Sequence, residues 1–425
     1  MSKKTYGGSK YSFHRKSFPL GKGGNGAVYD VYPDPTIGFP VVAKFFECDK
    51  SNRETRYKRF KREIETVYRL EDVKGILPII DYCCPEECPV ETDAAWYLMA
   101  KAEQFNISIN RKIENKIDDM LCLAEIIQEL HSRNQAHRDI KPENILISKG
   151  EIILSDFGLA WGLEDERLTK KMERIGPYKI LPPEMEEVSL DQDIDFRPAD
   201  VYLFAKVLWM YIKRDTIGFR GQYNRRDDQI YLDKHKVKVL TLEPIHRLLE
   251  QATEEYPDKR ITIAGCIENL KLQQRIIKKE IKEASLIRAL LFEETTKRAL
   301  QRISPDVYLY DNKEHILRAL ETILPYSSIA IKDMSGKREV LIGTNFTIDK
   351  VSENIWRLDG YIERSVYRQL YFNAESMTHR ARNTELVLRL KPIPDEEMEG
   401  NNLRSISRKN LINPTSIIEI GRFGV

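Results

Sequence analysis

The stretch AHRDIKPENILIS, residues 136–148, places several side chains that can do chemistry within eight positions of one another. Asp139 could accept a proton, Lys141 could neutralise a developing negative charge, and Asn144 could offer an oxygen to a hard cation. A solvated surface turn could have the same composition. The interpretation therefore depends on whether partners for this chemistry occur elsewhere in the chain.

Such partners occur on both sides of the stretch. Twelve residues after Asn144, the apolar run EIILS leads to Asp156 in SDFGLAW. The oxygens of Asp139, Asn144 and Asp156 would together suit Mg²⁺ that is bound with phosphate. Upstream, LGKGGNGAVYDVY has β-rich sequence on both sides of its glycines, which favours a glycine hairpin over phosphates rather than a Rossmann turn. Its candidate residues are Gly21, Gly23, Gly26 and Val28.

A basic residue and an acidic residue follow the glycine hairpin. Lys44 lies in the β-rich run VVAKFF, and Glu63 comes nineteen residues later in a segment with helical periodicity. A strand Lys and a helix Glu could form an ion pair that directs the ammonium group at phosphate oxygens.

The ordered motifs resemble the Ser/Thr branch of the protein kinase superfamily over about residues 15–275, and the resemblance suggests a soluble bacterial member of the eukaryotic-like kind. The resemblance implies that Asp139 accepts the substrate hydroxyl proton, that Lys141 neutralises the transferred phosphoryl group, and that Asn144 and Asp156 hold Mg²⁺. Lys44 would bind the ATP phosphates and pair with Glu63. Met99 would be the gatekeeper, with Ala100 to Ala102 in the hinge that binds adenine.

Three further residues complete the resemblance: Glu184 in PPE, Asp200 in PADVYLFAKVLW and Arg260 in PDKRITI. It implies a buried Glu184–Arg260 ion pair and a catalytic loop anchored by Asp200. Two positions depart from the family pattern. Val42 stands where a small alanine usually lies in the roof of the adenine pocket, and Pro177 stands where a threonine usually contacts the catalytic Asp and Lys.

Composition and periodicity predict the organisation of the chain. The 425 residues carry 68 basic and 66 acidic side chains, a balance that gives no general attraction to nucleic acid or membrane. Without a signal peptide or a membrane-length apolar run, the protein is expected to be cytoplasmic. Cys83, Cys84 and Cys88 lack a fourth ligand nearby, so free thiols are favoured over a zinc site.

The predicted fold class is α+β, a two-lobed protein kinase fold followed by a separate α+β domain. Residues 1–16 read as a basic flexible tail and 17–275 as the catalytic domain. Within it, 17–99 form the β-rich N-lobe, 100–103 the hinge and 104–275 the helical C-lobe. Residues 276–425 form an accessory domain of unknown function, beginning with a long amphipathic helical stretch after Arg275. This division predicts that residues 1–275 fold without the rest.

The predicted function is ATP- and Mg²⁺-dependent phosphorylation of Ser/Thr hydroxyls in protein substrates. A pseudokinase or signalling scaffold and a small-molecule kinase of the aminoglycoside type are the alternatives. The only Ser or Thr between Asp156 and Glu184 is Thr169, which makes it the candidate phosphosite for autophosphorylation in a transient homodimer. Arg138 and the arginines at 53, 56 and 59 could bind that phosphate. The acidic run at 164–166 could instead occupy the same arginines.

Overall fold

The computed structural model describes residues 4–23, 26–47, 52–91, 93–162, 180–186, 194–225, 227–280, 284–303, 307–341, 343–362, 366–380, 385–406 and 410–421. The chain divides into two compact units. Unit 1 comprises Met1–Tyr223 and Arg247–Gln274, and unit 2 comprises Asn224–His246 and Arg275–Val425. Residues 224–246, predicted as part of the kinase C-lobe, therefore group with the C-terminal part of the chain.

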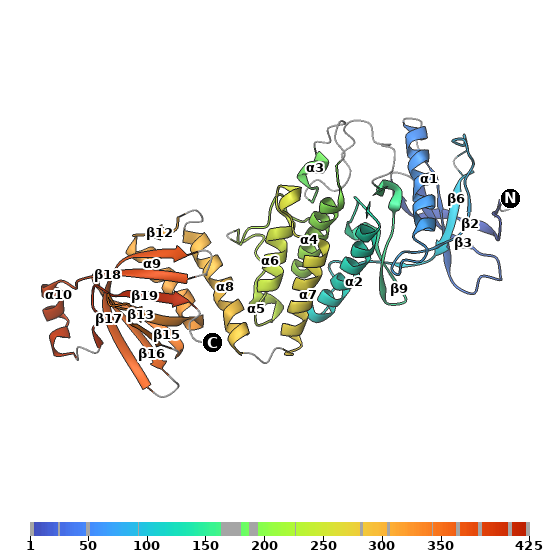
Figure 1. Ribbon diagram of the computed structural model, residues 1–425. Coiled ribbons are helices and arrows are strands. Elements are labelled where there is room, and N and C mark those ends of the chain that lie inside the picture. The colour runs from blue at the N-terminus through green and yellow to red at the C-terminus, as the bar shows by residue number, and fades with distance from the viewer. Residues whose placement is uncertain are drawn as a thin grey trace. The chain divides into compact units, whose positions relative to one another are not determined.

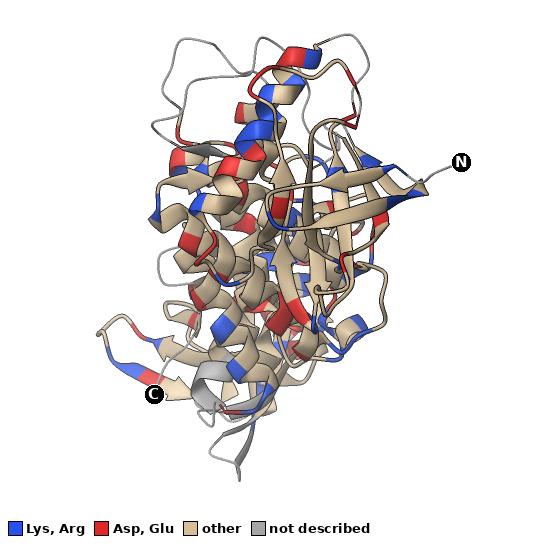
Figure 2. Cartoon of the chain, turned by 90° about the vertical axis from the view of Figure 1, so that its right-hand side faces the viewer, with Lys and Arg blue, Asp and Glu red and all other residues tan. Residues whose placement is uncertain are grey.

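The first part of unit 1 is a six-stranded sheet beside one helix, α1 (Arg53–Arg69). Aromatic side chains from several strands, among them Phe13, Phe45 and Trp96, form its core. Helix α1 buries Phe60, Ile64 and Val67, which recur at helical spacing. Figure 2 colours the positions of Lys and Arg blue and those of Asp and Glu red along the chain. In sheet order the strands are β1 (Thr5–Gly7), β2 (Ser12–Gly23), β3 (Gly26–Tyr32), β4 (Val41–Phe45), β6 (Trp96–Ala100) and β5 (Ile79–Cys83).

The prediction of a flexible tail over residues 1–16 is wrong for the described residues from Lys4 onward. Strand β1 pairs antiparallel with β2, so Tyr6 lies opposite Phe13 in the core. The loop between them wraps around the buried carboxylate of Asp81, which accepts hydrogen bonds from the backbone N–H groups of Ser9, Lys10 and Tyr11. The basic composition indicated a solvated segment, but this acceptor, seventy residues away, orders the backbone.

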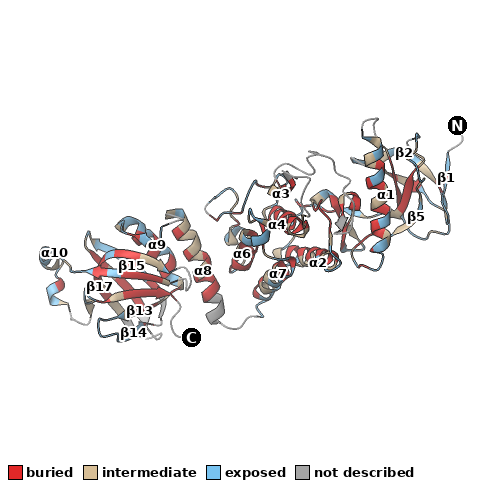
Figure 3. Cartoon of the chain, turned by 45° about the horizontal axis from the view of Figure 1, so that its top comes forward, coloured by how far each residue is buried: buried red, intermediate tan, exposed pale blue. Residues whose placement is uncertain are grey.

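The second part of unit 1 is mainly helical and is organised around α4 (Arg197–Lys213), in which every residue from Ala199 to Ile212 is buried (Figure 3). A helix that is apolar on all sides must lie inside a core. The neighbouring elements are α2 (Ile113–Ser132), α3 (Pro183–Glu186), α6 (Glu243–Ala252, which crosses into this unit at residue 247), η3 (Pro257–Lys259) and α7 (Ile263–Ile277, which leaves it after Gln274). The chain between the helices also forms short strands and 3₁₀ turns. These are β7 (Glu103–Gln104), β8 (Gln135–Ala136), η1 (Pro142–Asn144), β9 (Ile145–Ser148), β10 (Glu151–Leu154), η2 (Phe157–Leu159) and β11 (Trp161–Gly162).

Two lysines lie inside this helical part with their ammonium groups on backbone carbonyls. Lys206 of α4 is fully buried and donates to the carbonyl oxygens of Phe219 and Gly221. Lys116 of α2 donates to the carbonyl oxygen of Tyr211 at 2.6 Å. Burial lowers the pKa of Lys206 to about 6 and that of Lys116 to about 8. The carbonyl acceptors replace only part of the water around each amine, so the charged form is disfavoured.

Unit 2 contains an antiparallel sheet whose order along the main path is β14-β13-β19-β18-β17-β16-β15 (Figure 1). Its core includes Leu320, Trp356 and Leu388. The elements, in chain order, are α5 (Lys234–Val237), α8 (Ala284–Ile303), β12 (Leu309–Tyr310), α9 (Lys313–Ile323), η4 (Leu324–Tyr326), β13 (Ser328–Lys332), β14 (Arg338–Leu341), β15 (Gly343–Ser352), β16 (Ile355–Ile362), β17 (Val366–Arg380), β18 (Glu385–Lys391), α10 (Asp395–Gly400), η5 (Leu403–Ser405) and β19 (Ile417–Gly421). The α+β accessory region expected from the sequence is therefore present.

Helix α8 binds the segment 224–246 through buried polar groups. Glu294 accepts hydrogen bonds from the Thr241 hydroxyl and from the backbone N–H of Leu242. Arg225 and Glu243, both fully buried, form an ion pair at 2.5 Å, and Arg298 donates to the carbonyl oxygen of Arg225. The long helical stretch predicted after Arg275 is in fact divided, because α7 ends at Ile277 and α8 begins at Ala284.

Candidate active site

A cavity of about 960 Å³ in unit 1 brings together all of the predicted catalytic, ATP-binding and metal-binding residues. The candidate phosphosite Thr169 lies outside the described residues, together with the acidic run at 164–166 and Pro177. The predicted residues that line the cavity are Gly21, Gly23, Gly26, Val28, Lys44, Glu63, Met99, Ala100, Ala102, Asp139, Lys141, Asn144 and Asp156.

The glycine-rich turn is a hairpin between β2 and β3. Gly21 lies opposite Val28, and Gly23 lies opposite Gly26. A Cβ atom at Gly26 would come within 2.2 Å of the carbonyl oxygen of Phe45. This close approach of two backbones requires glycine, and it keeps the hairpin next to strand β4, which carries Lys44.

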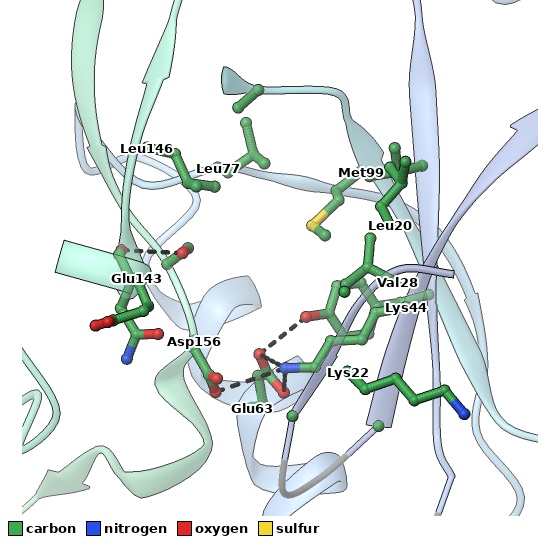
Figure 4. A pocket seen from close by; sticks show the side chains of 18 of the residues that line it. Leu20, Lys22, Val28, Lys44, Glu63, Leu77, Met99, Glu143, Leu146 and Asp156 are labelled. Atoms are coloured by element: carbon green, nitrogen blue, oxygen red, sulfur yellow. Dashed lines mark hydrogen bonds and ion pairs between the residues drawn. The ribbon is translucent and has the colours of Figure 1, made fainter. Parts of the chain in front are cut away.

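Lys44 and Glu63 form the expected ion pair inside the cavity (Figure 4). The Lys44 ammonium group donates to both carboxylate oxygens of Glu63, at 2.7 and 2.8 Å, and lies 3.5 Å from a carboxylate oxygen of Asp156. A third buried group joins them, since the Tyr97 hydroxyl donates to Glu63 at 2.9 Å. Glu63 thus receives three hydrogen bonds that hold it toward the cavity.

The two carboxylates around Lys44 are perturbed in opposite directions. Burial raises the pKa of Glu63, although Lys44 counteracts this effect. Burial also acts to raise the pKa of Asp156, but the charges of Lys44 and Lys141 hold it below its usual value. The pKa of Lys44 is raised, because the attraction of Asp156 and Glu63 outweighs its burial. Asp156 is therefore ionised at neutral pH and Lys44 is charged.

The catalytic loop is anchored by Asp200, as the sequence predicted. Its carboxylate accepts the backbone N–H groups of His137 and Arg138, each at 2.7 Å, from the first turn of α4. His137 is fully buried, packs against Phe157 and lies 3.1 Å from the carbonyl oxygen of Ser155, which suits a packing role. Arg138 has φ 67°, a left-handed conformation that these two hydrogen bonds stabilise.

The loop places two polar side chains around the carboxylate of Asp139. The Lys141 ammonium group donates to Asp139 at 2.6 Å, and the Asn144 side-chain amide donates to the same carboxylate oxygen at 2.9 Å. The amide of Asn144 also donates to the carbonyl oxygen of Asp139 at 2.8 Å. Because its nitrogen is occupied in this way, Asn144 can offer its carbonyl oxygen to a cation.

Asn144 and Asp156 have the donor chemistry that Mg²⁺ requires. Both offer hard oxygen atoms from the cavity wall. Among the described residues, no group of three or more His, Cys, Asp and Glu side chains could hold a metal ion. A site with few protein ligands fits Mg²⁺, which is usually bound through one or two carboxylates together with substrate phosphates. Cys83, Cys84 and Cys88 carry free thiols.

The other end of the cavity is apolar. Leu20, Val28 and Met99 lie on one side of it, and Leu77 and Leu146 lie on the other (Figure 4). Such walls suit a flat heterocycle. Val42 lies opposite Met99 in the β4–β6 pairing and also lines the cavity. Val42 therefore does line the adenine end of the cavity, where the family usually has alanine, and its larger side chain narrows the apolar end.

Two further sets of residues bear on the site: the Glu184–Arg260 pair, which the sequence analysis predicted, and Tyr97, which it did not. Arg260 and Glu184 form the predicted ion pair through two hydrogen bonds, at 2.5 and 2.8 Å. Tyr97 was missed by the sequence analysis. It lies two residues before Met99 in an apolar strand, and no local pattern shows that its hydroxyl reaches α1.

This geometry is that of a phosphotransfer site between a glycine hairpin and a catalytic loop. The family profile described as "Protein kinase domain" matches residues 14–287, which is more than half of the chain. The chain therefore belongs to the protein kinase family, with its β-rich and helical parts as expected.

Curated relatives carry the names of serine/threonine kinases. The chain is 30% identical over 205 residues to serine/threonine-protein kinase PknH of Mycobacterium bovis, a match that covers 46% of this chain and 32% of the relative. It is 30% identical over 193 residues to a probable serine/threonine-protein kinase of Clostridium acetobutylicum, covering 45% and 28%. Aurora kinase of Schizosaccharomyces pombe is 27% identical over 261 residues, covering 58% and 67%.

The match to PknH spans about a third of that protein's length. Within the described ranges, every helix is too short or too polar to cross a membrane.

Proposed function

We propose that the chain is an ATP-dependent protein kinase that phosphorylates Ser or Thr hydroxyls. The observation that carries the proposal is the single cavity in which Lys44, Asp139, Asn144 and Asp156 converge below a glycine hairpin. A pseudokinase would be expected to lack one of these groups. The names of the relatives support Ser/Thr specificity, as does Lys141 two positions after Asp139.

Each residue contributes a distinct step. Asp139 accepts the proton of the attacking hydroxyl, while Lys141, 2.6 Å away, offsets the negative charge that develops on the transferred group. Lys44, held by Glu63, binds phosphate oxygens of ATP. Asn144 and Asp156 would hold Mg²⁺, which neutralises phosphate charge when it is bound. The apolar end of the cavity receives adenine, with hydrogen bonds from the backbone of Ala100 to Ala102.

Transfer of radiolabelled phosphate from [γ-³²P]ATP tests this proposal. The purified full chain should label a generic protein such as casein but not small alcohols. Asp139→Asn should lower the rate by at least 100-fold, because general-base catalysis contributes about 10²–10⁴. Asp258→Asn, at an exposed position, is the matched control. Transfer to alcohols alone would favour a small-molecule kinase, and ATP binding without any transfer would favour a pseudokinase.

Activation by phosphorylation of Thr169 extends the proposal. Burial, together with the positive charges of Arg59 and Arg62, lowers the pKa of Arg138 to about 10, so these arginines lie within one another's field. Such a cluster favours a nearby phosphate. Arg53, in contrast, donates to the carbonyl oxygen of Pro89 at 2.7 Å and is committed to that loop.

Mass spectrometry and kinetics test the activation step. Thr169 should become phosphorylated on incubation with ATP, and Thr169→Ala should lower activity. If the reaction occurs between two copies, the initial rate of labelling should rise with the square of enzyme concentration. An active Thr169→Ala variant would instead favour ordering of the segment by its own acidic run.

A further inference from the structure

A second cavity, of about 640 Å³, lies within unit 2, between α8, α9 and the segment around α5. Its volume falls in the range of cavities that bind small molecules. None of its lining residues belongs to the active site. They are Tyr231, Asp233, Lys234, His235, Glu294, Thr295, Arg298, Ala299, Arg302, Ile303, Arg318, Glu321, Thr322 and Tyr326.

One wall of this cavity is held in place by stacked rings. The Tyr231 ring stacks on His246 with centroids 5.1 Å apart and planes 6° apart. The guanidinium carbon of Arg298 lies 3.4 Å from the centroid of the Tyr231 ring. Arg298 also donates to the carbonyl oxygen of Arg225 and to the carboxylate of Asp228. The phenol is therefore fixed before any ligand binds, which lowers the entropic cost of binding.

Basic and acidic side chains both line the cavity: Lys234, Arg298, Arg302 and Arg318 together with Asp233, Glu294 and Glu321. Arg298 and Arg302 both pair with Asp228, so Lys234 and Arg318 are the basic groups to which an anion could bind. Two of these acids have local partners, since Asp233 accepts the backbone N–H of His235, and Glu294 accepts that of Leu242.

The basic residues near the cavity also affect the buried imidazole of His246. Burial and the charges of Arg225, Arg298, Lys297 and Lys234 hold the pKa of His246 well below its ordinary value. His246 is therefore neutral at pH 7, and its 3.9 Å approach to Glu294 is not an ion pair at that pH.

Part of the cavity lining is apolar. Ala299, Ile303 and Tyr326 pack against the hydrophobic core of unit 2 and also line the cavity. The Lys234 ammonium group lies 5.5 Å from the centroid of the Tyr326 ring, so a basic group and an apolar surface adjoin there. A ligand that uses both has an apolar body and one anionic group.

We propose that this cavity binds a small organic anion, with a phosphate or carboxylate group against Lys234 and Arg318 and an apolar body against Ile303 and Tyr326. The site goes beyond the kinase activity. Its wall at 231–235 lies inside the stretch that matches the kinase family, whereas α9 lies beyond it. A ligand would thus contact both the kinase-family sequence and the accessory region.

Calorimetric titration of the full chain with phenyl phosphate tests the proposal, with phenol as the uncharged analogue. Saturating ADP is present throughout, so that the active-site cavity is occupied. Phenyl phosphate should bind and phenol should not. Arg318→Gln and Lys234→Gln should each weaken binding about tenfold, the scale of one charge-assisted hydrogen bond. Lys332→Gln, at an exposed position on β13, should bind like the wild type.

The outcomes separate this proposal from the proposed kinase function. Asp139→Asn should abolish phosphotransfer and leave phenyl phosphate binding unchanged. No binding, or binding that is equal in wild type, Arg318→Gln and Lys234→Gln, would overturn the proposed site. Benzoate in place of phenyl phosphate distinguishes the two head groups, and the tighter of the two identifies the ligand class.

Discussion

Tyr97→Phe isolates one hydrogen bond in the active site. The substitution removes only the hydroxyl that donates to Glu63 at 2.9 Å, and the ring stays in its buried position. Glu63 keeps both hydrogen bonds from Lys44. We infer that Tyr97 is a positioning residue, which acts through Glu63 on the lysine that binds phosphate.

The size of the effect follows from burial and charge. Tyr97, Glu63 and Lys44 are all buried, and a hydrogen bond to a charged group in such a site contributes about 1.5–3 kcal/mol. Loss of that free energy shifts the equilibrium away from the paired arrangement by about 10- to 150-fold. We expect kcat/KM for ATP to fall about tenfold. The pKa of Glu63, raised by burial and lowered in part by the Tyr97 hydroxyl, should rise further, so that the acidic limb of the pH–rate profile moves to higher pH.

Steady-state kinetics across pH, with thermal unfolding of the same samples, measures this effect. Tyr29→Phe is the matched control, because Tyr29 is also buried and donates to a carboxylate, that of Glu47, but does not line the cavity. A Tyr97→Phe enzyme with wild-type kcat/KM and an unmoved acidic limb would refute the reasoning. An equal loss in Tyr29→Phe would show instead that general weakening of the lobe is responsible.

Three further predictions concern stability. Asp81→Asn should destabilise the protein by about 1–3 kcal/mol at pH 7, because an amide cannot accept all the N–H groups around that site. The hydrogen bonds hold the pKa of Asp81 below its usual value despite burial. In urea titrations, the greater stability of the wild type should therefore be present above about pH 4 and should fade as pH falls through the folded pKa. The pKa of Lys206 is about 6 in the folded protein, below that of the unfolded chain. The free energy of unfolding should therefore rise with pH between about 6 and 10, by up to about 1.4 kcal/mol per pH unit. Lys206→Met should abolish that part of the pH dependence. In calorimetry, a chain ending at residue 275 should unfold at a lower temperature than one ending at residue 303. The shorter chain lacks Glu294, so the Leu242 N–H loses its acceptor. Equal unfolding temperatures would instead support residue 275 as the domain boundary.

The active site could be predicted from sequence because its chemistry depends on short motifs. Asp139, Lys141 and Asn144 lie on one loop, and only the side-chain types at those spacings can serve the reaction. The Lys44–Glu63 and Glu184–Arg260 pairs were accessible through the resemblance to a known family. Periodicity indicated the β-rich start of the first unit, the helix that carries Glu63 and the helical part that follows.

The features that escaped prediction are long-range contacts of buried polar groups. A basic, glycine-containing segment becomes strand β1 and a tight loop only because Asp81, far along the chain, accepts its N–H groups. Helix α8 binds residues 224–246 through Glu294, which accepts the backbone N–H of Leu242, and through Arg298, which donates to the carbonyl oxygen of Arg225. No local pattern specifies such partners, since a backbone N–H looks the same at every position in a sequence.

A charged residue within an apolar run is nevertheless a readable sign of these contacts. Lys206 interrupts VYLFAKVLWMYI, which is too apolar to expose that face of the helix. A buried ammonium group must find oxygen atoms, and here the carbonyl groups of Phe219 and Gly221 supply them. Lys116 reaches the Tyr211 carbonyl at the last turn of the same helix in the same way. Such a residue therefore predicts that a loop or helix end, with its unpaired carbonyl groups, lies against the helix at that level.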